Sequence, residues 1–192
     1  MGIAVISIAL LMTLSACRGF HPGMANAPEI FDEGTGNTVS VVSKPLVFAR
    51  DRTDVAAFAR DYATLVAVEV DHSGDFVNYL LLYRWSTVDR RMSPPPNPDS
   101  GELKIIAEGR VLDLRPLDAV PVSLIKGAAL HVPAHEDTVT HAYRVDTDVL
   151  RFVATSGTLA VRLPQEPLDT PFRMWEDGRG ALREFLSRSV NP

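Results

Sequence analysis

The pattern of apolar and polar positions along the chain is mainly that of β-strands. Within 63–71 the valines at 66, 68 and 70 alternate with Leu65, Ala67 and Glu69, 72–75 has the composition of a turn, and 76–88 is a long β-prone run. An alternating strand, a turn and a second strand together predict a β-hairpin. The second strand is apolar on both faces in its middle, which is typical of a central strand that is covered on both sides.

Shorter segments of the same character predict further strands. Turn-forming residues or prolines bound most of them. These segments are 39–50, broken by Pro45; 103–107 paired with 110–114 around Glu108-Gly109; 120–125 paired with 128–132 around Lys126-Gly127; 139–145; 158–163; and 172–175.

Three segments predict helices. Thr53 or Asp54 is a candidate cap for one or two turns within 51–60, and the oxygens at 146–148 are candidate caps for a short helix that ends at Gly157. A third helix is expected over 180–189. Its apolar residues share one helical face, which we expect to pack against the sheet. These residues are Ala181, Leu182, Phe185 and Leu186.

Together these elements predict a mainly β domain of the β-rich α+β type, an antiparallel sandwich-like or partly open barrel fold with a C-terminal amphipathic helix. The chain has 192 residues, of which 46% are hydrophobic and 22% charged, and this composition is sufficient for one domain with a core. Residues 17–38 contain many Gly, Pro and Asn residues and no sustained apolar period, so we expect a flexible tether there. A single globular domain is then expected over 39–192.

The amino-terminal segment has the features of an export signal. An apolar run over 3–14 is too short to span a bilayer as a helix, and it ends in the tetrapeptide Leu14-Ser15-Ala16-Cys17. Cys17 is the only cysteine, so the chain cannot form an internal disulfide. The tetrapeptide resembles the lipobox of bacterial lipoproteins. This resemblance covers residues 1–17 only, and no Lys or Arg precedes the apolar run.

The resemblance implies a lipid anchor. Residues 1–16 would be a signal peptide that is removed on export, and Cys17 would carry a covalent diacylglycerol and an N-acyl chain. Two or more acyl chains hold a protein stably in a lipid bilayer, whereas one holds it only marginally. In enteric bacteria an Asp after the cysteine of such lipoproteins favours the inner membrane, so the resemblance together with Arg18 implies the outer membrane of the bacterial cell envelope, with the protein facing the periplasm.

Charge and motifs argue against several functional classes. The formal net charge is -5 and the pI is near 5.5, whereas nucleic-acid binding needs a dense basic surface, so no nucleic-acid partner is expected. The phosphate-binding motifs GxGxxG and GxxxxGK[ST] and the nucleophile elbow GxSxG are absent. We therefore expect no cofactor other than the lipid on Cys17.

Histidines provide one candidate for metal chemistry. His131, His135 and His141 lie close together in the sequence, and a loop could gather them around zinc with Glu136 or Asp137. A proline between the first two prevents the helical HExxH arrangement. Surface or turn positions are the more frequent role of such histidines, so no metal site is predicted.

Other candidate residues have ordinary structural roles as alternatives. Arg90 and Arg91 suit a surface ion-pair cluster but could also meet phosphate. Trp85 and Trp175 are expected in the core or at its rim, and the proline-rich segment 89–101 is expected to be an exposed loop. Paired carboxylates could support glycoside hydrolysis, although each is also expected on a solvated strand face or turn. The candidates are Glu69, Asp71, Glu136 and Asp137.

Two functions from different classes follow from these observations. The first is a non-enzymatic envelope lipoprotein whose β-rich domain binds an envelope protein or helps an assembly, for example through free strand edges. The alternative is a periplasmic hydrolase or metal-binding protein that uses the region 131–141. We favour the first because no catalytic set is recognisable.

Overall fold

The computed structural model describes residues 28–88, 101–131, 139–163 and 170–188. Strands hold 49% of these residues and helices 21%, so the predicted mainly β fold is confirmed. The expected signal peptide and Cys17 lie outside the described residues. The same is true of most of the predicted proline-rich loop, from 89 to 100.

Ten strands and four helical segments make up the described part of the chain. The strands are β1 (Glu29–Asp32), β2 (Asn37–Val41), β3 (Leu46–Asp51), β4 (Arg60–His72), β5 (Asp75–Ser86), β6 (Leu103–Ala107), β7 (Arg110–Leu114), β8 (Val139–Val145), β9 (Leu159–Arg162) and β10 (Phe172–Glu176). The helical segments are α1 (Val122–Ala128), the 3-10 turn η1 (Ala129–His131), α2 (Thr147–Thr155) and α3 (Arg179–Arg188).

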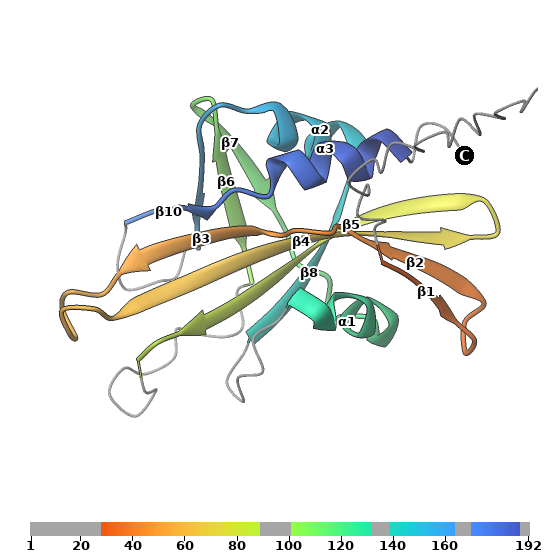
Figure 1. Ribbon diagram of the computed structural model, residues 1–192, viewed down its shortest axis with the longest axis horizontal. Helices are drawn as coiled ribbons and strands as arrows, with labels where there is room; N and C mark the ends of the chain where they lie inside the picture. The colour runs from red at the N-terminus through yellow and green to blue at the C-terminus, as the bar shows by residue number, and fades with distance from the viewer. Residues whose placement is uncertain (1–27, 89–100, 132–138, 164–169, 189–192) are drawn as a thin grey trace, which may run out of the picture.

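The strands form one antiparallel sheet built around β4 (Figure 1). Along one edge β4 pairs with β5, and β5 pairs with β8. Along the other edge, β2 pairs with the C-terminal part of β4 and β3 with its N-terminal part, and the sheet continues from β3 through β10, β9 and β6 to β7. The sheet does not close into a barrel. The N–H of Leu117, beyond β7, nevertheless donates to the carbonyl of Ala142 on β8.

The predicted central hairpin is confirmed as β4 and β5. Ser73 and Gly74 form its two-residue turn with positive φ angles of 54° and 97°, and His72 lies opposite Asp75. Positive φ at both turn positions gives the turn whose twist matches that of the flanking strands. Because β5 lies between β4 and β8 and residues 80–83 are buried, the predicted central strand is also confirmed.

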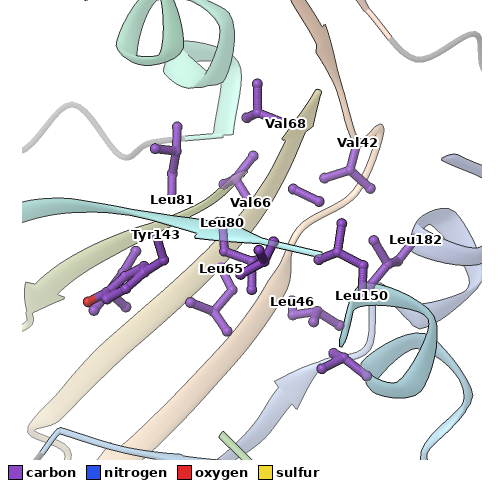
Figure 2. Packing of buried hydrophobic residues seen from close by; sticks show 14 of the residues in the cluster. Val42, Leu46, Leu65, Val66, Val68, Leu80, Leu81, Tyr143, Leu150 and Leu182 are labelled. Atoms are coloured by element: carbon purple, nitrogen blue, oxygen red, sulfur yellow. The ribbon is translucent and has the colours of Figure 1, made fainter. Parts of the chain in front are cut away.

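Helices α2 and α3 pack against each other and cover one face of the sheet (Figure 1). Leu150 of α2 and Leu182 of α3 lie beside each other in the core, next to Leu46 of β3 (Figure 2). Phe185 and Leu186 are buried with Leu182, which confirms the predicted apolar face of α3. The C-terminal helix is therefore part of the core rather than a free amphipathic segment.

Two arginines of α3 join its first turns to the C-terminal end of α2. The Arg183 Nη1 donates to the carbonyl of Ala154 at 2.9 Å, and Arg179 donates to the carbonyls of Ser156 and Gly157. The last carbonyls of a helix have no partner within the helix. Arginine side chains from α3 satisfy them here, so the two helices are held together by polar contacts as well as by the core.

The segment 122–131 is helical, so the strand pair that the sequence predicts over 120–132 is wrong. The carbonyl of Pro121 accepts the N–H of Leu124 at 3.1 Å in the first turn of α1. Leu124, Gly127 and Ala128 recur at helical spacing and are the buried residues of this helix. Two of these three are small, so the apolar period is weak in the sequence.

Close contact with β2 explains why α1 prevails over the β propensity of its residues. A Cβ atom on Gly127 would lie 2.9 Å from Cγ1 of Val39, so only glycine lets the helix approach the strand this closely. The β-branched Val122 and Ile125 are 65% and 42% exposed and take no part in the core. Packing against the sheet therefore overrides local preference. In this way α1 covers the face of the sheet opposite α2 and α3.

The helix expected within 51–60 is also absent, and turns connect β3 to β4 instead. The N–H groups of Val55 and Ala56 both bond to the carbonyl of Arg52, at 2.9 and 3.2 Å, but no second turn follows. Phe58 is 91% exposed, so the segment has no apolar face docked on the core. A short helix without such packing is marginal in water.

The sheet begins earlier in the chain than the sequence predicts. β1 and β2 form a hairpin, and the carbonyl of Pro28 accepts the N–H of Val41 at 3.0 Å. Residues from Glu29 onward therefore belong to the sheet, which corrects the predicted domain start at 39 and the part of the predicted tether from 29 to 38, whereas residues 17–27 lie outside the described residues. Gly, Pro and Asn form turns within a hairpin as readily as they form a linker.

Gly178 lies where β10 meets α3, and we expect its replacement by alanine to destabilise the protein. A Cβ at this position would lie 2.2 Å from the carbonyl oxygen of Pro45. Such overpacking costs about 1–3 kcal/mol in the free energy of unfolding, measured by denaturant titration. Gly180→Ala is the matched control, because its nearest atom is Arg183 Nη2 at 3.9 Å and alanine is the better helix former. Equal stability of Gly178→Ala and the parent would contradict this contact.

Candidate functional site

Two aromatic side chains stack on one face of the central hairpin. The register of β4 and β5 places Tyr62 directly opposite Trp85. Their ring centroids are 4.1 Å apart and the ring planes differ by 8°. Side chains that lie opposite each other in an antiparallel pair point to the same face, so this contact follows from the hairpin register.

Trp175 of β10 and Arg60 of β4 extend this pair across the sheet. Trp175 meets Tyr62 edge to face with centroids 6.3 Å apart, and the Arg60 guanidinium lies 4.4 Å from the Trp175 ring centroid. Asp51 accepts a hydrogen bond from Arg60 Nε at 2.8 Å and fixes the guanidinium. We call Arg60, Tyr62, Trp85 and Trp175 the aromatic patch. It lies on the ends of the strands that extend beyond α2 and α3 (Figure 1).

A network of ion pairs and hydrogen bonds on the opposite face of the sheet stabilises the strand ends that carry the patch. Asp61, between Arg60 and Tyr62 in the chain, accepts hydrogen bonds from Ser86 Oγ (2.7 Å), Arg50 Nη2 (2.8 Å) and Arg52 Nη1 (3.0 Å). Burial opposes ionisation of this carboxyl, but the three donors outweigh it and lower the pKa of Asp61. Since the donors come from β3, β5 and the residue after β3, the network ties three strand ends together.

The patch is accessible despite this support. Trp175 is 51% exposed, whereas Tyr62 and Trp85 are half-buried. A half-buried stack beside an exposed indole and a fixed guanidinium is a preorganised surface, and little side-chain entropy remains to be lost on binding. The prediction that the two tryptophans occupy the core or its rim is therefore resolved in favour of the rim.

The described histidines of the 131–141 region take part in separate packing contacts. His131 Nε2 lies 2.7 Å from the carbonyl oxygen of Val42. His141, on β8, packs beside Gly101 and Pro116. Its pKa is lowered mainly by burial and to a lesser extent by the positive charge of Arg84. Among the described residues, no group of three or more His, Cys, Asp or Glu side chains is placed to hold a metal ion. His135 lies outside the described residues.

The described candidate carboxylates lie on one face of β4 but have different surroundings. Glu69 is buried, and Asp71 accepts the N–H of Gly74 at 2.7 Å and so stabilises the turn of the central hairpin. The other candidate side chains lie outside the described residues. These are Glu136, Asp137, Arg90 and Arg91.

Ser123 and Lys126 form a pair that sequence reasoning overlooked. They have the spacing of the SxxK motif of some serine acyl-enzymes. On a strand, as predicted for 120–125, they would point to opposite faces, whereas α1 places them one turn apart. Lys126 is exposed, and a lysine that serves as a base needs burial or a neighbouring cation to activate it. The pair is therefore adequately explained by the surface of α1.

Tyr62 and Arg60 are the members of the patch that sequence reasoning missed. The signal for Tyr62 lay in the hairpin itself, because a two-residue turn at Ser73-Gly74 fixes the register and places Tyr62 opposite Trp85. The position of Trp175 depends on the pairing of β10 with β3, which are far apart in the chain. No local pattern in the sequence reveals that pairing.

Comparisons with known proteins add no relationship on which a function could rest. No protein-family model, curated protein or solved structure matches the chain. Within the described ranges, no helix has the length and apolar character that a membrane crossing requires. The functional argument therefore depends on the geometry of the aromatic patch and on the sequence of the amino-terminal segment.

Proposed function

We propose that the chain is a lipid-anchored protein of the bacterial cell envelope whose β-rich domain is a non-enzymatic binding module. Export would remove residues 1–16, and Cys17 would carry the diacylglycerol and the N-acyl chain. The acylated cysteine would hold the protein in a lipid bilayer. The expected location is the outer membrane, with the domain facing the periplasm. The domain would dock an envelope protein through the aromatic patch, and that patch is the observation that carries the proposal.

The composition of the patch favours a protein as the partner. Trp, Tyr and Arg are the residues most enriched among those that dominate binding energy at protein interfaces. The patch combines all three within direct contact of one another, at the rim of a rigid sheet. An exposed Trp175 can enter a pocket on the partner, while Arg60 offers a charged edge to an acidic or carbonyl-rich surface.

Site-specific photo-crosslinking in the producing bacterium tests this surface. A photoreactive amino acid at position 175 is expected to give a discrete protein adduct, while the same group at position 111 should give none. Val111 on β7 is the matched control, because it is 52% exposed and Trp175 is 51% exposed. Adduct formation from position 111 alone, or adducts to lipid only from position 175, would contradict a protein-docking patch.

A substitution next to the crosslinking position sharpens the test. Arg60→Ala removes the guanidinium that borders position 175, and loss of a dominant interface residue lowers affinity by about tenfold or more. We expect the adduct from position 175 to fall accordingly. Lys104→Ala, which breaks an exposed ion pair with Asp113, is the control and should leave the adduct unchanged.

A further inference from the structure

A row of three polar residues, continued by a valine on β8, crosses the sheet at the end of β4 opposite the aromatic patch. Ser40, Glu69, Asn78 and Val145 lie opposite one another on β2, β4, β5 and β8. Residues paired in this way share a face of the sheet. It is the face that carries Leu80, two residues after Asn78, and thus the face that α2 and α3 cover.

Two oxygen atoms in this row are buried without a hydrogen-bond partner. Glu69 is 8% exposed and its Oε2 is buried, and Asn78 is 6% exposed with a buried Oδ1. The amide nitrogen of Asn78 donates to Thr147 Oγ1 at 3.0 Å, so its oxygen is directed away from Thr147. Burying an ionised carboxylate without compensation is costly, so a bound cation would stabilise its ionised form.

The described part of the chain supplies no cationic side chain to this carboxylate. None of its ion pairs involves Glu69, and the nearest polar groups by register are the hydroxyl of Ser40 and the amide of Asn78. Carboxylate, amide and hydroxyl oxygens are the ligands that hard metal cations prefer. Asp71 places a second carboxylate on the same face of β4, two residues further along.

We propose that Glu69, Asn78 and Ser40 form a calcium site on the sheet beside the start of α2, where Thr147 Oγ1 accepts from the Asn78 amide nitrogen and so orients the amide oxygen toward the ion. Calcium accepts an irregular set of oxygen ligands and completes it with water, whereas magnesium demands a near-ideal octahedron and loses its water reluctantly. One buried carboxylate among neutral oxygens suits a weak site, with a Kd of about 10⁻⁴–10⁻³ M, as in extracellular modules. The site links β2, β4 and β5 to α2, so occupancy stabilises the folded domain.

Thermal unfolding of the full-length protein after treatment with a chelator tests the site. Calcium at roughly ten times the expected Kd should raise Tm by about 3–5 °C. Glu69→Gln keeps the volume of the side chain but removes its charge, and it should abolish the response. Asp113→Asn, which alters an exposed carboxylate on β7, should keep it. Equilibrium dialysis of the unsubstituted protein with calcium should give one bound ion per chain, whatever the stability of the variants.

One competing arrangement would overturn the proposal. If the Asn78 amide is rotated by 180°, its nitrogen faces Glu69 and donates to the carboxylate, while Thr147 Oγ1 donates to the amide oxygen. The row then needs no ion, dialysis gives no bound calcium, and calcium leaves Tm unchanged. A calcium response that persists in Glu69→Gln would equally exclude the site.

Discussion

Phe185→Ala is expected to lower the free energy of unfolding by about 3–5 kcal/mol, the usual cost of truncating a buried phenylalanine to alanine. Phe185 is 4% exposed and lies on the face of α3 that also buries Leu182 and Leu186. The truncation removes the transfer energy of the ring and leaves a cavity between α3 and the rest of the core. Denaturant unfolding followed by circular dichroism measures the loss.

Ser187→Ala is the matched control on the same helix. Ser187 is exposed, and its hydroxyl bonds only to the carbonyl of Glu184 in its own helix. Exposed substitutions of this kind change stability by about 0.5 kcal/mol or less. If Phe185→Ala were as stable as the parent while the adduct from position 175 disappeared, α3 would be an interaction surface rather than part of the core.

Local signals predict the elements whose chain neighbours are also their partners. The β4–β5 hairpin and the β6–β7 hairpin follow from alternation around a two-residue turn, and Glu108 and Gly109 have the positive φ angles that the second turn requires. α2 begins at the predicted position after β8, but Asp146 makes no side-chain cap hydrogen bond. The apolar spacing of α3 is likewise visible in the sequence.

Elements that depend on distant partners are not predicted by local pattern. α1 exists because Gly127 permits close approach to Val39 of β2, and a glycine is not a helix signal. The order of strands from β3 through β10 and β9 to β6 joins segments that no short connection relates. Pro45 marks the break between β2 and β3, but only the structure shows that both strands lie along the same edge of β4.

For the candidate site, too, the sequence points to single residues but not to their assembly. Trp85 and Trp175 stand out as rim candidates because an indole has a large apolar body and a polar tip. Their assembly with Arg60 requires the long-range register between β10 and β3. The buried Glu69 is a candidate carboxylate in the sequence, but its lack of a partner becomes visible only when β2, β4 and β5 are placed side by side.

Cys17→Ser is expected to abolish lipid attachment completely and to leave residues 1–16 in place. The sulfur would be the acyl acceptor, and in lipoproteins with this motif signal removal follows acylation. Metabolic labelling with a fatty acid measures the loss. Arg18→Ala leaves the acceptor intact and should keep the full label. Label that persists in Cys17→Ser would exclude this cysteine as the acylation site.

The mass of the mature amino-terminal peptide tests the lipid anchor most directly. The proposal predicts a peptide that begins at Cys17 and carries the combined mass of a diacylglycerol and an N-acyl chain. Mass spectrometry of the protein purified from bacterial membranes measures this mass. A mature chain that begins at another residue, or that carries an unmodified Cys17, would contradict the account of an anchored envelope protein.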